Sequence, residues 1–202
     1  MIEIICHGLM NALDTGLCLL DEYGTIVMVN DAWRELTDSL TGVLKQRSFV
    51  EFANREAHRL SIGDGVSTVL RITIDHDGHR AGDTMLMDAT RVIKRNLRSI
   101  DVMGRFEGDE FAVIMPGSDY LAAYKIADRI RKAVEEQSVE DNDQTAIVST
   151  LSVGMSQLHR ESLDVDVVLS EANQALEHAK QAKRNRISIF EELTLRPVDD
   201  GC

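Results

Sequence analysis

Cysteine and proline are scarce in this sequence of 202 residues. The three cysteines, Cys6, Cys18 and Cys202, lie far apart and form no C-x-x-C pattern. A disulfide framework or a structural zinc site is therefore not expected, and the pattern is typical of a reducing cytoplasm. The two prolines, Pro116 and Pro197, mark no low-complexity linker. We expect one domain with a short extension.

Basic residues are also in the minority. Lysine and arginine number 22 against 34 aspartates and glutamates, and the formal net charge is -12. Nucleic-acid binding depends on clustered basic side chains, so a nucleic-acid polymer is not the expected partner. A small anion held by a local basic patch is still compatible with this composition.

Long hydrophobic runs are missing as well. No apolar run approaches the ~20 residues that span a bilayer. The first ten residues lack the basic start and long apolar core of a signal peptide. These absences predict a cytoplasmic protein without a membrane span.

The hydrophobic pattern after residue 38 predicts alternating helices and strands. Strands are expected at 66–74, 102–106, 111–115, 146–155 and 186–190, and an acidic loop at 137–144. Helices are expected at 83–97, 120–134 and 165–182, with an earlier one capped by Ser39 or Thr41 and running to about Leu60. This order predicts an α/β (α+β) fold with a ferredoxin-like β-α-β-β-α-β core, in which helices cover a central sheet. Many nucleotidyl cyclases and polymerase palms use that core.

A polar turn between two of these strands has two adjacent carboxylates, Asp109 and Glu110. Gly108 suits a turn with an unusual backbone angle or a closely approaching ligand. The carboxylates could hold Mg²⁺ against a triphosphate or accept a proton from a ribose hydroxyl, as phosphoryl transfer requires. A solvated acidic turn would account for the same residues.

Six motifs in order resemble those of the GGDEF family, which includes the diguanylate cyclases. They are Asp38-Ser-Leu-Thr-Gly, Arg47-Ser-Phe, Gly78-His79 with Gly82-Asp83, Glu107-Gly-Asp-Glu-Phe, Thr150-Leu-Ser-Val-Gly, and Ala179-Lys180 with Arg184-Asn185-Arg186. The resemblance implies a GGDEF domain at 38–192, preceded by a short helix and hairpin at 1–37 and followed by a tail at 193–202.

The resemblance also implies a reaction. Two GTP molecules, one on each domain of a homodimer, condense into cyclic di-GMP and release two pyrophosphates. The implied catalytic residues are Asp109 and Glu110, and the implied ligands of Mg²⁺ or Mn²⁺ are Asp109, Glu110 and Asp75. The implied substrate contacts are Gly108, Asp83, His79, Lys180 and Arg184.

Two basic residues in the last motif suit the phosphates. Lys180 and Arg184 are four residues apart and share one face of the helix end. They could bind phosphates, or they could be a solvated basic helix end.

An inhibitory site is implied by Arg98 and Asp101, which form the family's R-x-x-D pattern before the signature turn. Cyclic di-GMP would dock there, with Arg105 as an additional contact. A local ion pair between Arg98 and Asp101 is the alternative.

The chain departs from the family just before the G-H motif, where the segment is shortened. In one register, residues 66–74 are the first core strand, Thr73 replaces the metal-binding aspartate and Asp75 is the second aspartate. In the other, residues 70–71 match the family's F-K and Val66 occupies the metal position. We favour the first because 66–74 has so clear a strand pattern. In both registers the guanine-reading asparagine is missing.

Further departures lie at Glu107, Asn173, Glu177 and Lys183, where the family has Gly, Asp, Tyr and Gly. They predict a partly degenerate cyclase with weak or lost activity. The alternatives are a non-catalytic module that senses cyclic di-GMP at the inhibitory site or GTP at the former active site, or a protein-interaction domain.

The first part of the chain resembles the opening hairpin of a PAS sensor domain. Two apolar runs, 16–20 and 25–29, are expected to pair across a turn after a helix at 2–12. A complete PAS pocket does not fit before residue 38, so we expect the hairpin to be a dimer contact or a flap, or else a remnant that covers an edge.

Overall fold

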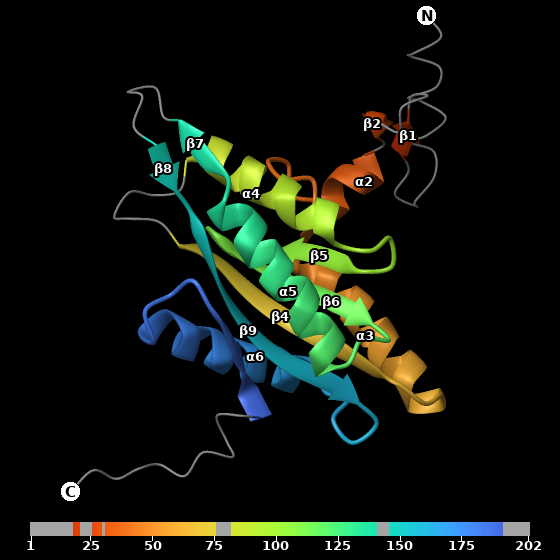
Figure 1. Ribbon diagram of the computed structural model, residues 1–202. Coiled ribbons are helices and arrows are strands. Elements are labelled where there is room, and N and C mark those ends of the chain that lie inside the picture. The colour runs from red at the N-terminus through yellow and green to blue at the C-terminus, as the bar shows by residue number, and fades with distance from the viewer. Residues whose placement is uncertain (1–17, 21–25, 30, 76–81, 141–145, 192–202) are drawn as a thin grey trace, which may run out of the picture.

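A mixed six-stranded sheet forms the centre of the protein (Figure 1). The computed structural model describes residues 18–20, 26–29, 31–75, 82–140 and 146–191. In order across the sheet, the strands are β10 (Ile187–Ile189), β9 (Thr150–His159), β4 (Val66–Asp75), β6 (Glu110–Pro116), β5 (Val102–Arg105) and β3 (Leu44–Lys45). The central strands are antiparallel, whereas β10 and β3 pair in parallel with β9 and β5.

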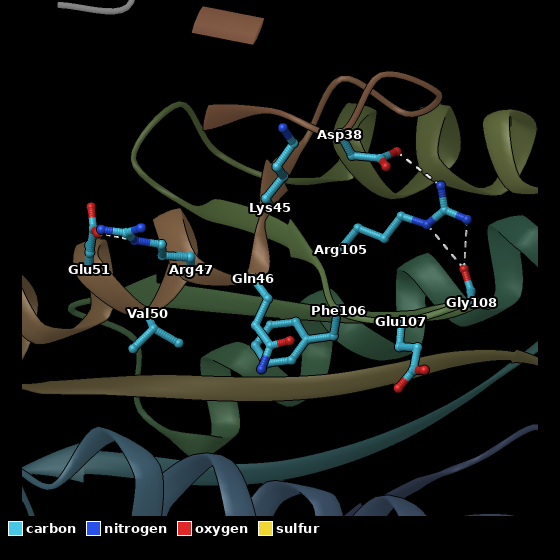
Figure 2. Close-up of a pocket in the computed structure, with 10 residues that line it drawn as sticks. All are labelled: Asp38, Lys45, Gln46, Arg47, Val50, Glu51, Arg105, Phe106, Glu107 and Gly108. Atoms are coloured by element: carbon cyan, nitrogen blue, oxygen red, sulfur yellow. Dashed lines mark hydrogen bonds and ion pairs between the residues drawn. The ribbon is translucent and has the colours of Figure 1, made fainter. Parts of the chain in front are cut away.

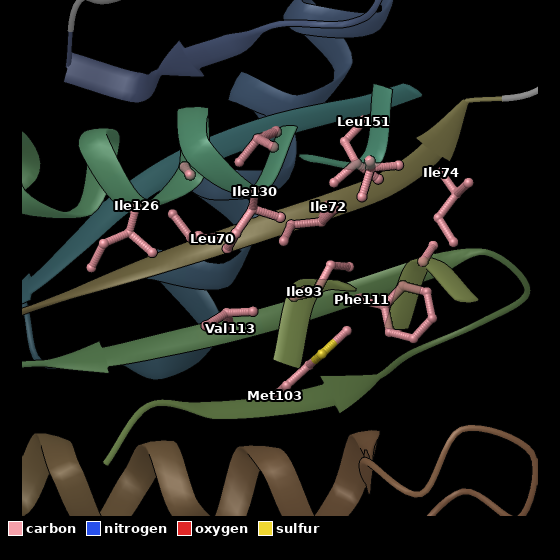
Figure 3. Close-up of a cluster of buried hydrophobic side chains, with 14 of the residues drawn as sticks. Leu70, Ile72, Ile74, Ile93, Met103, Phe111, Val113, Ile126, Ile130 and Leu151 are labelled. Atoms are coloured by element: carbon pink, nitrogen blue, oxygen red, sulfur yellow. The ribbon is translucent and has the colours of Figure 1, made fainter. Parts of the chain in front are cut away.

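Two helices cover each face of the sheet (Figure 1). α4 (Asp83–Asn96) and α5 (Tyr120–Glu135) pack on one face, and α3 (Gln46–Ile62) and α6 (Val165–Gln181) pack on the other. β4 is therefore buried on both sides. Its even-numbered apolar residues, Leu70, Ile72 and Ile74, lie in the core beneath α4 and α5 (Figure 3). The odd-numbered residues from 67 to 75 face α3 and α6.

The predicted fold class is confirmed. The elements β4-α4-β5-β6-α5-β9 follow the β-α-β-β-α-β order of the ferredoxin-like core. The predicted strand at 66–74 is confirmed, because β4 pairs with β6 on one side and with β9 on the other. The helices predicted at 83–97, 120–134 and 165–182 each agree with the structure within one residue at either end.

The predicted start of the first large helix is wrong. One carboxylate oxygen of Asp38 accepts hydrogen bonds from the backbone N–H and the hydroxyl of Thr41, at 2.9 and 2.7 Å. Gly42 then adopts a φ of +64°, and the chain turns. After β3 the helix begins at Gln46, so neither Ser39 nor Thr41 caps it.

The region 137–155 also differs from the prediction. A short antiparallel hairpin, β7 (Ser138–Glu140) with β8 (Ala146–Val148), occupies part of the predicted acidic loop and the start of the predicted strand. The main strand β9 begins at Thr150 and continues to His159, beyond the predicted end.

The predicted N-terminal hairpin is confirmed. β1 (Cys18–Leu20) pairs antiparallel with β2 (Ile26–Val29), and the helix α2 (Asp31–Leu36) follows. The predicted helix at 2–12 and the tail at 193–202 lie outside the described residues. Within the described part of the chain, no helix combines the length and apolarity needed to cross a bilayer.

Candidate functional site

The turn between β5 and β6 is a tight hairpin closed by its own backbone. The N–H of Glu110 donates to the carbonyl of Glu107 at 2.8 Å, and the N–H of Phe106 donates to the carbonyl of Glu110 at 2.9 Å. Gly108 has a φ of +56°, which suits a residue without a side chain. The turn therefore presents Asp109 and Glu110 at the start of β6.

Arg105 supports this turn from one side (Figure 2). Its guanidinium donates to the carbonyl of Gly108 at 3.0 and 2.8 Å and to the carboxylate of Asp38 at 3.0 Å. Burial alone would raise the pKa of Asp38, but hydrogen bonds from Thr41 and Arg105 outweigh it and lower that pKa. Arg105 thus ties the loop before α3 to the signature turn.

A groove of about 940 Å³ lies beside the turn (Figure 2). Its lining mixes charges of both signs, because Lys45, Arg47 and Arg105 face it together with Asp38 and Glu107. Glu107, which the sequence places where the family has glycine, is exposed at its edge.

Glu110 is engaged by two basic side chains on the other side of the turn. Arg71 Nη2 lies 2.5 Å from Glu110 Oε2, and Lys180 Nζ lies 3.2 Å from Glu110 Oε1. Lys180 also contacts Glu177 at 2.9 Å. Burial alone would lower the pKa of Lys180, but its bonds to Glu177 and Glu110 outweigh this and raise it. Both carboxylate oxygens of Glu110 therefore accept from cations of the same chain.

Arg71 is built into the packing of the sheet. Its side chain is 9% exposed, and its guanidinium carbon lies 4.2 Å from the centre of the Phe106 ring. Phe106 in turn packs edge-on against Phe49 of α3, with ring centres 5.5 Å apart. Burial lowers the pKa of Arg71, and the charge of Glu110 opposes that effect. An arginine nevertheless remains protonated in proteins, so this is a fixed positive charge.

The residue opposite Glu110 on β4 is Thr73, not a carboxylate. Two residues further along the same face, Asp75 is buried and accepts from the hydroxyls of Thr150 at 3.0 Å and Ser152 at 2.8 Å. The backbone N–H of Asn185 also donates to it at 3.2 Å. Asp75 therefore anchors β9 and the exit of α6 to the end of β4.

A small polar pocket of about 190 Å³ lies at this edge of the sheet. It is lined by Thr73, Ile74, Asp75, Asp109, Lys180 and Arg184. The structure thus brings together five of the residues that the sequence proposed or discussed for the active site, from β4, the signature turn and the end of α6. The two cations in this lining, Lys180 and Arg184, suit an anion such as a phosphate.

The exit of α6 places Arg184 beside this pocket through an unusual backbone. Lys183, Arg184 and Asn185 have φ values of +83°, +54° and +47°. Arg184 Nε lies 3.8 Å from Asp75 Oδ1. The side chain of Asn185 accepts from Arg131 at 2.7 Å and donates to Glu135 at 2.8 Å, which holds the turn against α5.

Two other predicted substrate contacts, Asp83 and His79, are not among the described residues that line the small pocket. Asp83 is exposed in the first turn of α4, where the helix dipole favours a carboxylate. It is not among the residues that line the small pocket. His79 lies outside the described residues.

The predicted inhibitory residues lie at the turn between α4 and β5. The N–H of Arg98 donates to Asp101 Oδ2 at 2.8 Å, and the guanidinium of Arg98 approaches the Ser118 hydroxyl at 3.4 Å. A pocket of about 420 Å³ is lined by both Arg98 and Asp101. Arg105 is not one of its lining residues and is engaged at the signature turn instead.

Arg71 is the site residue that sequence reasoning did not assign. Its signal in the sequence is a charged residue with apolar neighbours on both sides, Leu70 and Ile72, in the middle of β4. An arginine between buried neighbours needs a partner of opposite charge. Its position two residues before Thr73 places both on one face of the strand.

The fold and this edge define a class of protein. An antiparallel ferredoxin-like core, with an acidic hairpin beside the central strand and basic residues at the end of the last large helix, is the plan of the nucleotidyl cyclases and polymerase palms. The family model described as "Diguanylate cyclase, GGDEF domain" matches residues 35–186. The chain belongs to the GGDEF family, whose cyclases generally depend on a divalent metal.

Curated relatives agree with this assignment. The chain is 31% identical over 163 residues to diguanylate cyclase A of Treponema denticola, covering 76% of this chain and 44% of the relative. It is 32% identical over 159 residues to the probable diguanylate cyclase DgcC of Escherichia coli, covering 75% of this chain and 42% of that protein. The chain therefore spans less than half the length of these two relatives.

Solved structures agree in fold. The GGDEF domain of DgcB from Caulobacter crescentus, in complex with c-di-GMP, superposes with a TM-score of 0.71 at 24% identity and covers 77% of this chain and 96% of that one. Diguanylate cyclase SiaD from Pseudomonas aeruginosa, in complex with its activator SiaC, superposes with a TM-score of 0.71 at 26% identity. The match covers 78% of this chain and 64% of that one.

Proposed function

We propose that this chain is a nucleotide-binding GGDEF domain that takes GTP at the small pocket beside the signature turn and forms cyclic di-GMP weakly or not at all. The observation that supports this proposal most is the set of contacts made by the Glu110 carboxylate. Both of its oxygens accept from cations of the chain, and Thr73 stands opposite it in place of a carboxylate. The phosphate-binding cations of the family remain, while its paired acidic centre does not.

The pocket suits the phosphates of GTP. Lys180 and Arg184 both line it, and charged hydrogen bonds from such groups to phosphate are strong and directional. Asp109 lines it as well and would act as the general base in any remaining turnover. Asp83 is proposed for the guanine edge, because a carboxylate accepts from two adjacent N–H groups.

The described carboxylates fit a divalent metal poorly. Mg²⁺ requires close to octahedral oxygen coordination, yet Glu110 and Asp75 already accept from basic groups, hydroxyls and a backbone N–H. In the part of the chain that the structure describes, no group of three or more acidic, histidine or cysteine side chains could hold a metal ion. The assignment of a metal to Asp75, Asp109 and Glu110 stays a prediction, and these contacts count against it.

Any remaining cyclase activity would need two copies of the domain, because each copy supplies one GTP to the condensation. We therefore propose a homodimer as the active form. Turnover per mole of protein would then rise with protein concentration.

Calorimetry with GTP and a chromatographic assay for cyclic di-GMP test this function. GTP is expected to bind, and Lys180→Ala is expected to weaken it about tenfold, the effect of losing one charged hydrogen bond. Lys132→Ala is the matched control, because Lys132 is 59% exposed and pairs with Asp128 on α5. Rapid formation of cyclic di-GMP, or unchanged GTP affinity in Lys180→Ala, would contradict the proposal.

A second candidate function is recognition of cyclic di-GMP at the turn between α4 and β5. Arg98 and Asp101 line a pocket of about 420 Å³ there, and an arginine with a carboxylate can together donate to and accept from a guanine edge. Calorimetry with cyclic di-GMP tests it. Arg98→Ala is expected to abolish binding, and Arg95→Ala on the exposed side of α4 is expected to leave it unchanged.

A further inference from the structure

Arg71 lies on the face of β4 that the active site uses. It alternates with Thr73 and Asp75 along the strand, and all three face α3 and α6. Its direct neighbours across the sheet are small, Ala112 on β6 and Gly154 on β9. The backbone of α6 fills the space above Gly154, and the guanidinium extends to the β6 side of the strand, where it reaches Glu110.

The charges at this point balance without a metal. Two carboxylates directly opposite each other on adjacent strands repel and require a cation between them. Here position 73 is a threonine, so one carboxylate is absent, and the remaining Glu110 meets a guanidinium at 2.5 Å. On this face Glu110 therefore faces a threonine across the strands and pairs with a basic side chain.

The guanidinium is held firmly in this position. It is nearly buried, it lies over the ring of Phe106, and its Nε has no hydrogen-bond partner among the described residues. A buried arginine with an unpartnered nitrogen depends on the charge of Glu110. Any metal that bound Glu110 would have to displace Arg71 and leave its charge buried without compensation.

We propose that Arg71 replaces the divalent metal of this site, so that the domain binds nucleoside triphosphate without one. The inference rests on the proposed function for its ligand, and it adds which cation neutralises Glu110. Arg71 neutralises one oxygen of the carboxylate, and Lys180 and Arg184, which line the small pocket, attract the phosphates. The expected ligand is the metal-free triphosphate.

GTP binding measured in EDTA and in Mg²⁺ tests this directly. The wild-type chain is expected to bind GTP in EDTA at least as tightly as in Mg²⁺. Arg71→Leu is expected to bind about tenfold more weakly in EDTA, because Glu110 then repels the phosphates, and to recover affinity when Mg²⁺ is added. Arg71→Lys, which keeps the charge, is expected to show no such dependence. Arg160→Leu is the matched control, since that side chain is 76% exposed. GTP binding by the wild type that requires Mg²⁺ would overturn the inference and leave the proposed function standing.

Metal binding without nucleotide gives a second, independent test. Paramagnetic resonance of added Mn²⁺ is expected to show no saturable site in the wild type or in Thr73→Asp, which retains Arg71. The double variant Arg71→Leu/Thr73→Asp is expected to gain one. A saturable Mn²⁺ site in the wild type that disappears in Glu110→Gln would overturn the inference. Absence of GTP binding in all variants would count against the proposed function, and the Mn²⁺ result would still decide the role of Arg71.

Discussion

Three consecutive residues at the exit of α6 have left-handed backbone angles. Lys183 has the largest positive φ of the three, +83°, and by the resemblance it occupies a position where the family has glycine. The left-handed region brings Cβ close to the backbone and costs roughly 1–2 kcal/mol for a residue with a side chain. The contacts of Asn185 with Asp75 and Arg131 hold this conformation in place.

Lys183→Gly is expected to stabilise the protein by about 1 kcal/mol, because glycine adopts this conformation without strain. Thermal unfolding should show a rise in Tm of about 2–4 °C for a chain of this size. Lys183→Ala is the control, since it removes the charge and keeps the Cβ. An equal gain in both variants would attribute the effect to charge rather than to strain.

A second residue-scale prediction concerns Glu56, which lies buried between α3 and β4. It accepts from Arg59 at 2.7 Å and from Ser67 at 2.5 Å. The Arg59 bond lowers the pKa of Glu56 most, burial opposes it, and the Ser67 bond adds to the decrease. A carboxyl whose pKa is lowered by folding stabilises the protein above the unfolded value of 4.5, and that contribution is lost as the pH falls through the lower folded value.

Glu56→Gln is therefore expected to lower the free energy of unfolding by about 2 kcal/mol at pH 7, the contribution of a charged hydrogen bond. The difference from wild type should shrink below pH 4.5, where the unfolded wild-type chain begins to bind the proton and the folded protein does not yet do so. Urea unfolding at a series of pH values measures it. Glu51→Gln, at an exposed pair with Arg47, should change stability by less than about 1 kcal/mol.

At the residue scale, the sequence predicted several residues that line the candidate site and did not predict the contact of Arg71 with Glu110. Motif spacing identified Asp109, Glu110, Lys180 and Arg184, because those patterns are local. The pairing of Arg71 with Glu110 joins residues 39 positions apart, and its geometry depends on the register of two strands. An arginine between apolar neighbours indicates a buried partner without saying which one.

Among the elements, β9 and α6 pack backbone against backbone at Gly154. A Cβ built on Gly154 would lie 2.0 Å from the carbonyl oxygen of Ala172 and 2.2 Å from the backbone nitrogen of Leu176. Both are backbone atoms inside a helix, so no side-chain rotation can relieve the clash. The glycine of the T-x-S-x-G strand therefore sets the distance of α6, and with it Lys180, from the sheet.

Gly154→Ala is expected to destabilise the protein by about 3 kcal/mol or more, since an overpacked core must shift its backbone. Denaturant unfolding gives the free energy, and GTP affinity reports the displacement of Lys180. Gly63→Ala is the control, because its φ is -121° and the nearest atom to its added Cβ lies 3.7 Å away. Similar effects at both glycines would contradict the close packing of α6.

Element boundaries were predictable where the pattern was long and local. β4, α4, α5 and α6 each extend over ten or more residues with a regular apolar period. β3 has only two residues and exists because it pairs with β5, a long-range contact that no local pattern contains. The start of α3 was missed for the same reason, since the turn before it is fixed by Asp38 and by the approach of Arg105.

For the whole molecule, the sequence predicted the fold, the family and the degenerate character of the motifs. The ferredoxin-like core and the family were confirmed, and the loss of activity stays a prediction. The favoured register of the shortened segment is supported by the full-length pairing of β4, which places Thr73 opposite Glu110. The domain boundaries at 38 and 192 also stay predictions, beside a family match over 35–186.

The proposed role of Arg71 has a consequence for how free Mg²⁺ affects GTP binding. A nucleotide that carries Mg²⁺ has less negative charge to offer a pocket whose cations are side chains. Magnesium would then compete with the protein for GTP, and a titration of Mg²⁺ against a constant GTP concentration should show occupancy falling steadily. Such a domain would bind more GTP as free Mg²⁺ becomes scarce, whereas a metal-dependent cyclase is expected to bind less.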